Sequence, residues 1–153
     1  GDEIKSINDG FLIQEKNLLK IKLSDLNQKS NFKLNISNKK DLVFALKVCK
    51  HVKSNAIVLC KNKKTVGIGA GQMSRIDSCK IALMKTGSKK KNKGFVAASD
   101  AFFPFTDNIK LLIKNNCKAI VQPEGSINDK KIIDYANKKK IPLYFVKNRF
   151  FKH

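Results

Sequence analysis

Residues 56–86 read AIVLCKNKKTVGIGAGQMSRIDSCKIALMKT, and this stretch decides the fold. Its two β-rich runs, Ala56–Lys61 and Thr65–Gly69, are joined by the polar turn Asn62–Lys64, a pattern that predicts a hairpin. Glycines follow the second run, and apolar residues then recur on one face of a segment from about Ser74 to Thr86. That period predicts a helix.

The rest of the chain continues this alternation of strands and helices. A helix is expected over Lys39–Val52, where apolar residues recur at i, i+3, i+4 and i+7, whereas residues 17–36 show no clear period. The other expected elements are strands over Gly10–Gln14, Phe95–Ala98, Cys117–Gln122 and Pro142–Val146, and helices from Asp107 or Asn108 to Asn115 and from Asn128 or Asp129 to about Lys138. Short connections between alternating elements predict an α/β fold with a mixed, mainly parallel sheet covered on both faces.

The chain of 153 residues is long enough for one compact domain with its own core. No linker, repeat or break divides it, so we expect a single domain over residues 1–153. No apolar run reaches the length of a membrane span, and no signal peptide is expected. The chain starts Gly1-Asp2-Glu3 without an initiator methionine, which predicts a fragment of a longer protein.

The four cysteines, Cys49, Cys60, Cys79 and Cys117, form no C-x-x-C pair and lie in apolar-periodic stretches. This spacing matches neither a zinc site nor the disulfide framework of a small secreted protein. We therefore expect buried, free thiols, as is typical of proteins in a reducing cytosol.

The most prominent feature of the composition is the net charge of +20 at pH 7. Such a charge is typical of nucleic-acid-binding proteins. However, only Arg75 and Arg149 of the 32 basic residues are arginine, and the abundance of Lys, Asn and Ile also follows from AT-rich codons. The runs Lys89–Lys91 and Lys138–Lys140 fall at an expected loop and helix end, where a solvated surface is the simpler explanation. The two arginines either remain by chance in a lysine-rich composition or occupy positions that need a planar, bidentate donor.

Four motifs follow the carboxyl ends of expected strands, where α/β sheets bind ligands. They are Gly67–Arg75, Asp100–Asn108, Pro123–Ser126 and Asn148–Phe150. Glycines before a helix suit an anion, and a cluster of aromatic residues with polar neighbours suits a planar ring. A tight turn, core packing, an ordinary helix start and a surface arginine are the respective structural alternatives.

In this order, and together with Lys53–Ala56, the motifs resemble the signature series of the AICAR transformylase domain, the C-terminal part of the bifunctional purine biosynthesis enzymes. The similarity extends from about Asp9 to His153. It implies a cytidine-deaminase-like, three-layer α/β fold that occurs twice in the family domain. This chain would supply the second copy.

The resemblance implies transfer of a formyl group from 10-formyltetrahydrofolate to the 5-amino group of AICAR, giving FAICAR in de novo purine (IMP) biosynthesis. Motif matching puts four residues on the AICAR side: Asn55, Arg75, Phe102 and Arg149. It puts six residues on the side of the folate: Ile76, Phe105, Asp107, Asn108, Ser126 and Ile127. Arg149 is assigned to the 5′-phosphate, because a guanidinium can bind phosphate with two hydrogen bonds. Asp107 is assigned to the N–H donors of the pterin.

The catalytic Lys-His pair of the family belongs to the first half of its domain, upstream of this chain. Lys50-His51 looks like that pair but lies in the helix before Asn55, and His153 ends the chain, so neither is expected to be catalytic. We therefore expect no catalytic residue here and an inactive isolated fragment. The resemblance further implies an IMP cyclohydrolase in the missing N-terminal part, a homodimer, no membrane association and a cytoplasmic location.

Two positions depart from the family pattern. Thr106 stands where the family usually has Arg, and Glu124 stands where it has Gly or Ser. Glu124 adds negative charge beside the expected site of a polyanionic folate. The resemblance also implies a structural monovalent cation, for which Asp100 is a candidate ligand and the full set of ligands is unknown.

Two other hypotheses stay open. A basic α/β module would bind nucleic acid through its lysine-rich face. In that case Arg75→Lys and Arg149→Lys would be nearly silent, whereas neutralising Lys89 to Lys93 would lower the salt dependence of binding. The product of a decaying gene would fold and yet stay inactive with the first half of the domain supplied.

Overall fold

The computed structural model describes residues 20–87 and 94–151. They form a six-stranded sheet with the strand order β1-β6-β5-β4-β2-β3. The strands are β1 (Asn27–Gln28), β2 (Ile57–Lys61), β3 (Lys64–Gly69), β4 (Val96–Ser99), β5 (Ala119–Pro123) and β6 (Leu143–Val146). The expected strand over Gly10–Gln14 and the run Lys89–Lys91 lie outside the described residues.

The sheet is mixed, as expected. β5 pairs in parallel with β4 and β6, whereas β2 is antiparallel to β3 and β4, and β1 is antiparallel to β6. Three of these five pairings are antiparallel, so the expectation of a mainly parallel sheet holds only for its central strands. The hairpin is the reason, because its first strand lies between two strands that run the opposite way. As a result, β3, β4, β5 and β6 all end at the same edge.

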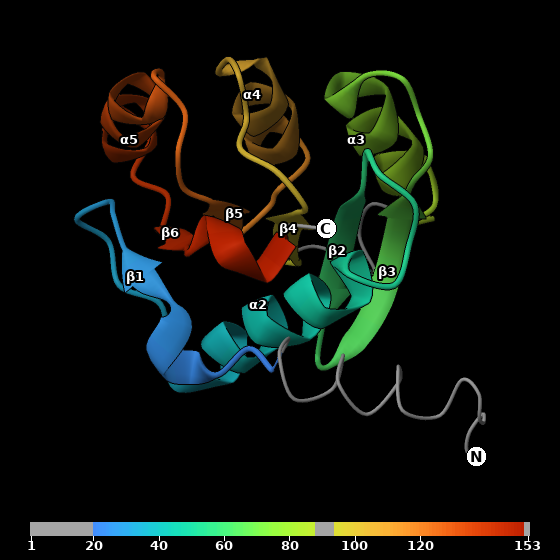
Figure 1. The fold of residues 1–153 in the computed structure, drawn as a ribbon, viewed down its shortest axis with the longest axis horizontal. Coiled ribbons are helices and arrows are strands. Elements are labelled where there is room, and N and C mark those ends of the chain that lie inside the picture. The colour runs from blue at the N-terminus through green and yellow to red at the C-terminus, as the bar shows by residue number, and fades with distance from the viewer. Residues whose placement is uncertain (1–19, 88–93, 152–153) are drawn as a thin grey trace.

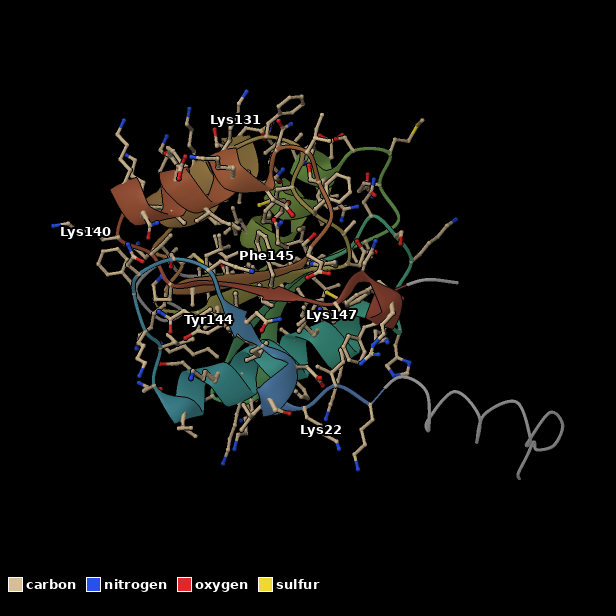
Figure 2. All side chains as sticks on the ribbon, turned by 60° about the vertical axis from the view of Figure 1, so that its left-hand side comes forward. Lys22, Lys131, Lys140, Tyr144, Phe145 and Lys147 are labelled. Carbon is tan, nitrogen blue, oxygen red and sulfur yellow. The ribbon has the colours of Figure 1, made fainter. Side chains whose placement is uncertain are left out.

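Helices cover both faces of the sheet and give the fold three layers (Figure 1). Their bounds are α2 (Ile36–Cys49) on one face, and α3 (Arg75–Met84), α4 (Asp107–Lys114) and α5 (Asp129–Lys138) on the other. Successive residues of β6 point to opposite faces (Figure 2): Tyr144 joins the core beside α2, and Phe145 joins the core of the other layer. The three-layer α/β fold is thus confirmed.

The bounds differ from expectation at the start of the chain. α2 begins at Ile36 rather than Lys39, because the Asn35 side chain caps it by accepting a hydrogen bond from the N–H of Asn38. The two-residue strand β1 lies within residues 17–36, where the sequence shows no period. A strand this short is too brief to produce a recognisable alternation.

A buried carboxylate on α2 fixes the turn of the β2–β3 hairpin. Asp41 is only 2% exposed and accepts hydrogen bonds from the N–H of Asn62 at 3.3 Å and of Lys63 at 2.8 Å. Both turn residues have positive φ, 53° and 59°. Asp41 therefore satisfies two backbone donors of the hairpin turn, and its side chain connects that turn to α2.

Two glycines let α3 approach the backbone of β3. A Cβ at Gly69 would lie 1.8 Å from the carbonyl oxygen of Ser78, and one at Gly67 would lie 2.1 Å from that of Ala82. No real Cβ tolerates such distances, so any side chain at either position would push α3 away from the sheet. The close approach matters for function because Arg75 begins this helix.

The four cysteines are buried and free, as expected. Burial raises the pKa of each thiol, to about 12 for Cys79, so the described thiols stay protonated at neutral pH. Within residues 20–87 and 94–151, no helix is long and apolar enough to cross a membrane. The same residues contain no group of three His, Cys, Asp or Glu side chains that could hold a metal ion.

Candidate functional site

The candidate site lies at the edge where β3, β4, β5 and β6 end. The register fixes this convergence, because Ile57 at the start of β2 pairs with Gly69 at the end of β3 and with Ser99 at the end of β4. The ends of β5 and β6 follow through their parallel pairings. All four sequence motifs therefore begin at one edge of the sheet, as their positions after strands predicted.

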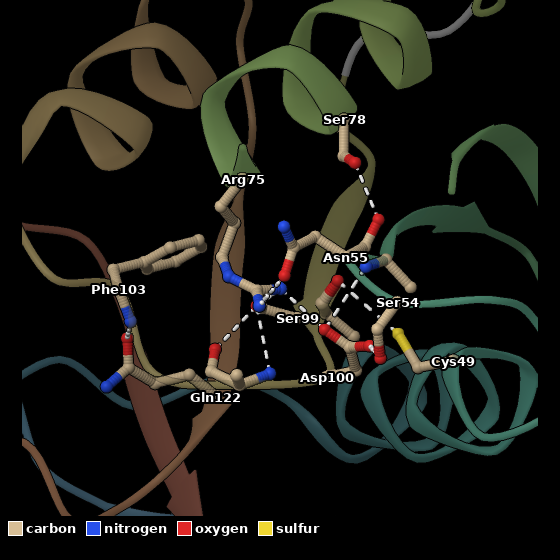
Figure 3. A network of polar contacts seen from close by, with 12 residues as sticks. Cys49, Ser54, Asn55, Arg75, Ser78, Ser99, Asp100, Phe103 and Gln122 are labelled. Atoms are coloured by element: carbon tan, nitrogen blue, oxygen red, sulfur yellow. Dashed lines mark hydrogen bonds and ion pairs between the residues drawn. The ribbon is translucent and has the colours of Figure 1, made fainter. Parts of the chain in front are cut away.

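The centre of this edge is a buried ion pair (Figure 3). Arg75 Nη1 lies 2.5 Å from Asp100 Oδ1, with side chains that are 11% and 6% exposed. Nη1 also donates to Ser99 Oγ at 3.2 Å, and Nη2 donates to Asn55 Oδ1 at 2.6 Å. Among the described residues, no group accepts a hydrogen bond from Nε. A guanidinium has five N–H donors, so Arg75 keeps donors for a ligand after its protein contacts are made.

Asp100 is held from three directions. Its Oδ2 accepts a hydrogen bond from Ser54 Oγ at 2.5 Å, and its Oδ1 accepts one from the backbone N–H of Ala56 at 3.1 Å. With Arg75 as counter-ion, the carboxylate is fully supported despite its burial. Both oxygens of Asp100 therefore serve the protein's own network. Its role as a cation ligand stays a prediction.

Asn55 is tied to the loop that precedes α3. Its Nδ2 donates to the carbonyl of Gln72 at 3.0 Å, and its own carbonyl accepts from Ser78 Oγ at 2.6 Å. The peptide bond between Ser54 and Asn55 is cis. The side-chain oxygen of Asn55 accepts a hydrogen bond from Arg75, so two residues expected on the AICAR side are in direct contact.

The aromatic segment after β4 divides between the core and the surface. Phe103 is fully buried, and its N–H donates to Gln122 Oε1 at 3.1 Å. Phe102 and Phe105 are 37% and 67% exposed. Core packing therefore explains only Phe103. The other two rings are accessible to a planar ligand, as their assignments to AICAR and to the folate require.

A shallow cavity of about 170 Å³ lies beside the segment that follows β4. It is lined by Pro104, Phe105, Thr106, Asn128, Lys131 and Ile132. Asn128 joins its two sides, since its Nδ2 donates to the Pro104 carbonyl at 2.8 Å and its N–H donates to Ser126 Oγ at 3.0 Å. Of the six expected residues, only Phe105 lines the cavity, and Ser126 contacts it through Asn128.

The remaining folate assignments differ in exposure. Ile127 is 99% exposed, Asp107 is exposed, and Ile76 is partly buried at the start of α3. Asn108 is only 2% exposed, and the described residues offer its Oδ1 no hydrogen-bond partner. A buried, unsatisfied amide oxygen is costly, which makes Asn108 the member of this group whose environment most calls for a further donor.

Arg149 lies apart from the Arg75 network. It belongs to the 3-10 helix η2 (Asn148–Phe151) after β6, is exposed, and has its guanidinium 5.4 Å from the centre of the Phe150 ring. No contact joins it to Arg75 within the described residues. The structure therefore brings Asn55 and Arg75 together and leaves Arg149 on a separate element at the same edge.

Sequence reasoning missed several residues of the site. Ser54, Ser99 and Gln122 each contact a partner far along the chain, and no local pattern reveals these distant contacts. Lys50 donates to the carbonyl of Phe150, so it is an interior contact rather than a plain surface residue. His51 is exposed.

The chain is similar in sequence to known proteins. A family model described as "AICARFT/IMPCHase bienzyme" matches residues 1–85. The chain is 46% identical over 156 residues to the bifunctional purine biosynthesis protein PurH of Prochlorococcus marinus (strain MIT 9215), covering 97% of this chain and 28% of that protein. The PurH proteins of Fusobacterium nucleatum and Buchnera aphidicola subsp. Baizongia pistaciae are 46% and 45% identical over 152 residues, covering 99% of this chain and 30% and 29% of theirs.

The chain spans less than a third of the length of these relatives. The family model covers more than half of it, and the relatives match almost all of it. The glycine run, Arg75 and the start of α3 lie within the matched residues 1–85. The chain therefore belongs to the AICARFT/IMPCHase bienzyme family.

Proposed function

We propose that this chain supplies substrate-binding residues to an enzyme that transfers a formyl group from 10-formyltetrahydrofolate to AICAR in purine biosynthesis. The observation that carries the proposal is the buried Arg75–Asp100 pair with Asn55 on its rim. It presents an oriented amide and spare guanidinium donors at the carboxyl edge of the sheet. Family membership connects this arrangement to AICAR.

In the proposed complex, Asn55 and Arg75 hydrogen-bond the polar groups of AICAR, and Phe102 packs against its ring. Asp100 neutralises Arg75, so the site binds the substrate by directed hydrogen bonds rather than by net charge. Arg149 supplies the net positive charge that a 5′-phosphate needs. The exposure of Phe102 and Arg149 supports these roles, because both side chains are accessible to a ligand.

The folate is proposed to lie on the side of Phe105 and α4. Asp107 would accept hydrogen bonds from the pterin, the Asn108 Oδ1 would gain a donor, and Ile76 and Ile127 would contact its apolar parts. The unsatisfied oxygen of Asn108 supports this placement. Thr106 lines the neighbouring cavity in place of the usual Arg and leaves it without that charge.

Other parts of the proposal concern the whole protein. The catalytic Lys-His pair, the cyclohydrolase and the remainder of the transformylase domain are assigned to sequence outside this chain, and the active unit is proposed to be a cytoplasmic homodimer. Met73 and Ile127 are each 99% exposed, and under this proposal another part of the protein covers them.

The proposal is tested with a chimeric enzyme. This chain replaces the matching segment of the Buchnera aphidicola PurH, to which it is 45% identical, and FAICAR formation from AICAR and 10-formyltetrahydrofolate is measured. We expect the chimera to be active and Arg75→Lys to lower kcat/KM by about a hundredfold, because the Lys ammonium cannot reach Asp100, Ser99 and Asn55 together.

Lys118→Arg is the matched control, since it exchanges the same two residue types at an exposed position before β5, on the opposite edge of the sheet. It should leave the rate unchanged. A folded chimera that binds neither AICAR nor folate, as measured by calorimetry, would contradict the proposal. Binding without turnover would show that the chain keeps the site but cannot support catalysis.

A further inference from the structure

The position of Arg149 depends on its backbone. Within the described residues its guanidinium has no hydrogen bond or ion pair, and it lies 5.4 Å from the centre of the Phe150 ring. Because no polar contact fixes this side chain, its position is set by the position of the helix that carries it. The element η2 spans only Asn148–Phe151, and a four-residue 3-10 helix has little internal stability.

Lys50, at the end of α2, contacts this short helix and holds it in place. It is the C-cap residue of α2, and its Nζ donates a hydrogen bond to the backbone carbonyl of Phe150. The same Nζ lies 5.5 Å from the centre of the Phe150 ring and 5.2 Å from that of Phe151. One ammonium group thus contacts the carbonyl of η2 and both of its aromatic rings, which is a combination of a charge-assisted hydrogen bond and cation–π contacts.

The base of Lys50 is itself rigid. Its backbone N–H continues the helical hydrogen bonding of α2 to the carbonyl of Leu46 at 3.2 Å. The preceding residue, Cys49, is buried with its Sγ 3.6 Å from the carbonyl of Ala98 on β4. Phe150 is 6% exposed and belongs to the core on the α2 side of the sheet. Lys50 therefore connects η2 to a fixed part of the molecule.

We propose that Lys50 is a positioning residue, which holds η2 against the end of α2 and so fixes where Arg149 meets the phosphate of the bound nucleotide. The phosphate part rests on the proposed function; the anchoring of η2 does not. Lys50 also precedes Ser54 and Asn55 by four and five residues. The same segment therefore leads from the anchor of Arg149 to the network of Arg75.

The test compares Lys50→Met with Lys50→Arg and Lys47→Met. Met is an unbranched side chain one atom shorter than Lys and lacks its charge and donors, whereas Arg keeps both. Lys47 is an exposed residue on the same helix, so its replacement by Met is a control for the loss of one charge. Two quantities are measured on each folded variant: the amide hydrogen exchange of residues 147–151, and the affinities for AICAR and for its riboside, which lacks the phosphate.

We expect Lys50→Met to speed the exchange of η2 by about tenfold and to weaken AICAR binding by about fivefold, because a lost charge-assisted hydrogen bond corresponds to changes of this size. Riboside binding should not change, Lys50→Arg should restore most of both effects, and Lys47→Met should resemble the unaltered chain. A general loss of stability would weaken the binding of AICAR and riboside alike.

Each other outcome has a defined meaning. Unchanged exchange of η2 in Lys50→Met would overturn the anchoring, whatever the binding data show. Faster exchange with unchanged AICAR affinity, in a protein where Arg149→Lys weakens that affinity, would overturn the link to the phosphate. If neither the unaltered chain nor the chimera binds AICAR while the exchange of η2 still rises, the proposed function fails and the anchor stands.

Discussion

At the scale of single residues, the site is organised by a few buried polar groups that satisfy one another. Arg75 and Asp100 are 25 positions apart in the sequence and form an ion pair that Ser54, Asn55 and Ser99 complete. Burial makes each member dependent on the others, because an unpaired charge at such a place is costly. The network therefore sets both local stability and the orientation of the groups that face a ligand.

Asp100→Asn is predicted to lower the free energy of unfolding by about 3 kcal/mol, because it leaves the buried Arg75 without its counter-ion. Urea denaturation followed by circular dichroism measures the change. Asp134→Asn is the control: its partner Lys130 is 2.7 Å away, but the side chains are 86% exposed for Lys130 and 60% for Asp134. That surface pair should contribute less than about 0.5 kcal/mol.

A double variant sharpens this prediction. Adding Arg75→Met to Asp100→Asn removes the uncompensated charge, so it should recover part of the lost stability. If the double variant loses the sum of the two single effects, the two side chains do not interact energetically, and the description of the site as a coupled pair is wrong.

At the scale of elements, the sequence predicted secondary structure best where a regular pattern extends over many residues, and worst where an element is short. The hairpin was expected from two β-rich runs around a polar turn, and the helices were expected from apolar residues that recur on one face. The strand β1 has only two residues and leaves no pattern. The early start of α2 at Ile36 depends on one cap, Asn35. The sequence placed the four motifs at one edge because parallel strands end together, which requires only the order of elements.

The contacts between those elements were beyond prediction from the sequence. That Asp41 caps the β2–β3 turn, or that Lys50 reaches Phe150 across 100 positions, follows from packing that no local pattern encodes. The separation of Arg149 from the Arg75 network is of the same kind. Motif matching identified candidate residues, and only the fold could say which of them touch.

Gly69→Ala is predicted to destabilise the fold by about 3 kcal/mol, because its Cβ would meet the Ser78 carbonyl oxygen at 1.8 Å and push α3 off β3. Gly87→Ala is the control. Gly87 has φ +73° and nothing within 4 Å of an added Cβ, so it should cost only about 1 kcal/mol through backbone strain. The urea concentrations at the unfolding midpoints of the two variants measure this difference. Equal losses of stability would contradict the steric explanation.

At the scale of the whole molecule, the net charge of +20 and the local design of the site point to different ligands. The positive charge comes from 30 lysines spread along the sequence and from two arginines, and the site neutralises one of these arginines with Asp100. Figure 2 shows Lys131 of α5 and Lys140, just beyond the end of that helix, pointing outward. A polyanion would respond to the total charge, and a nucleotide would respond to the directed groups at the sheet edge.

This difference gives a prediction that separates the proposed function from nucleic-acid binding. Duplex DNA should bind weakly, with a dissociation constant above about 1 μM at physiological salt, and the affinity should fall steeply as salt increases.

Arg75→Lys and Arg149→Lys keep the net charge, so they should leave DNA binding unchanged while weakening AICAR binding. Replacing Lys89, Lys90, Lys91 and Lys93 by Gln should lower the salt dependence of DNA binding and spare AICAR. DNA binding that is tight at physiological salt, together with AICAR affinity that ignores both arginines, would favour a nucleic-acid module, because only total charge would then determine what the protein binds.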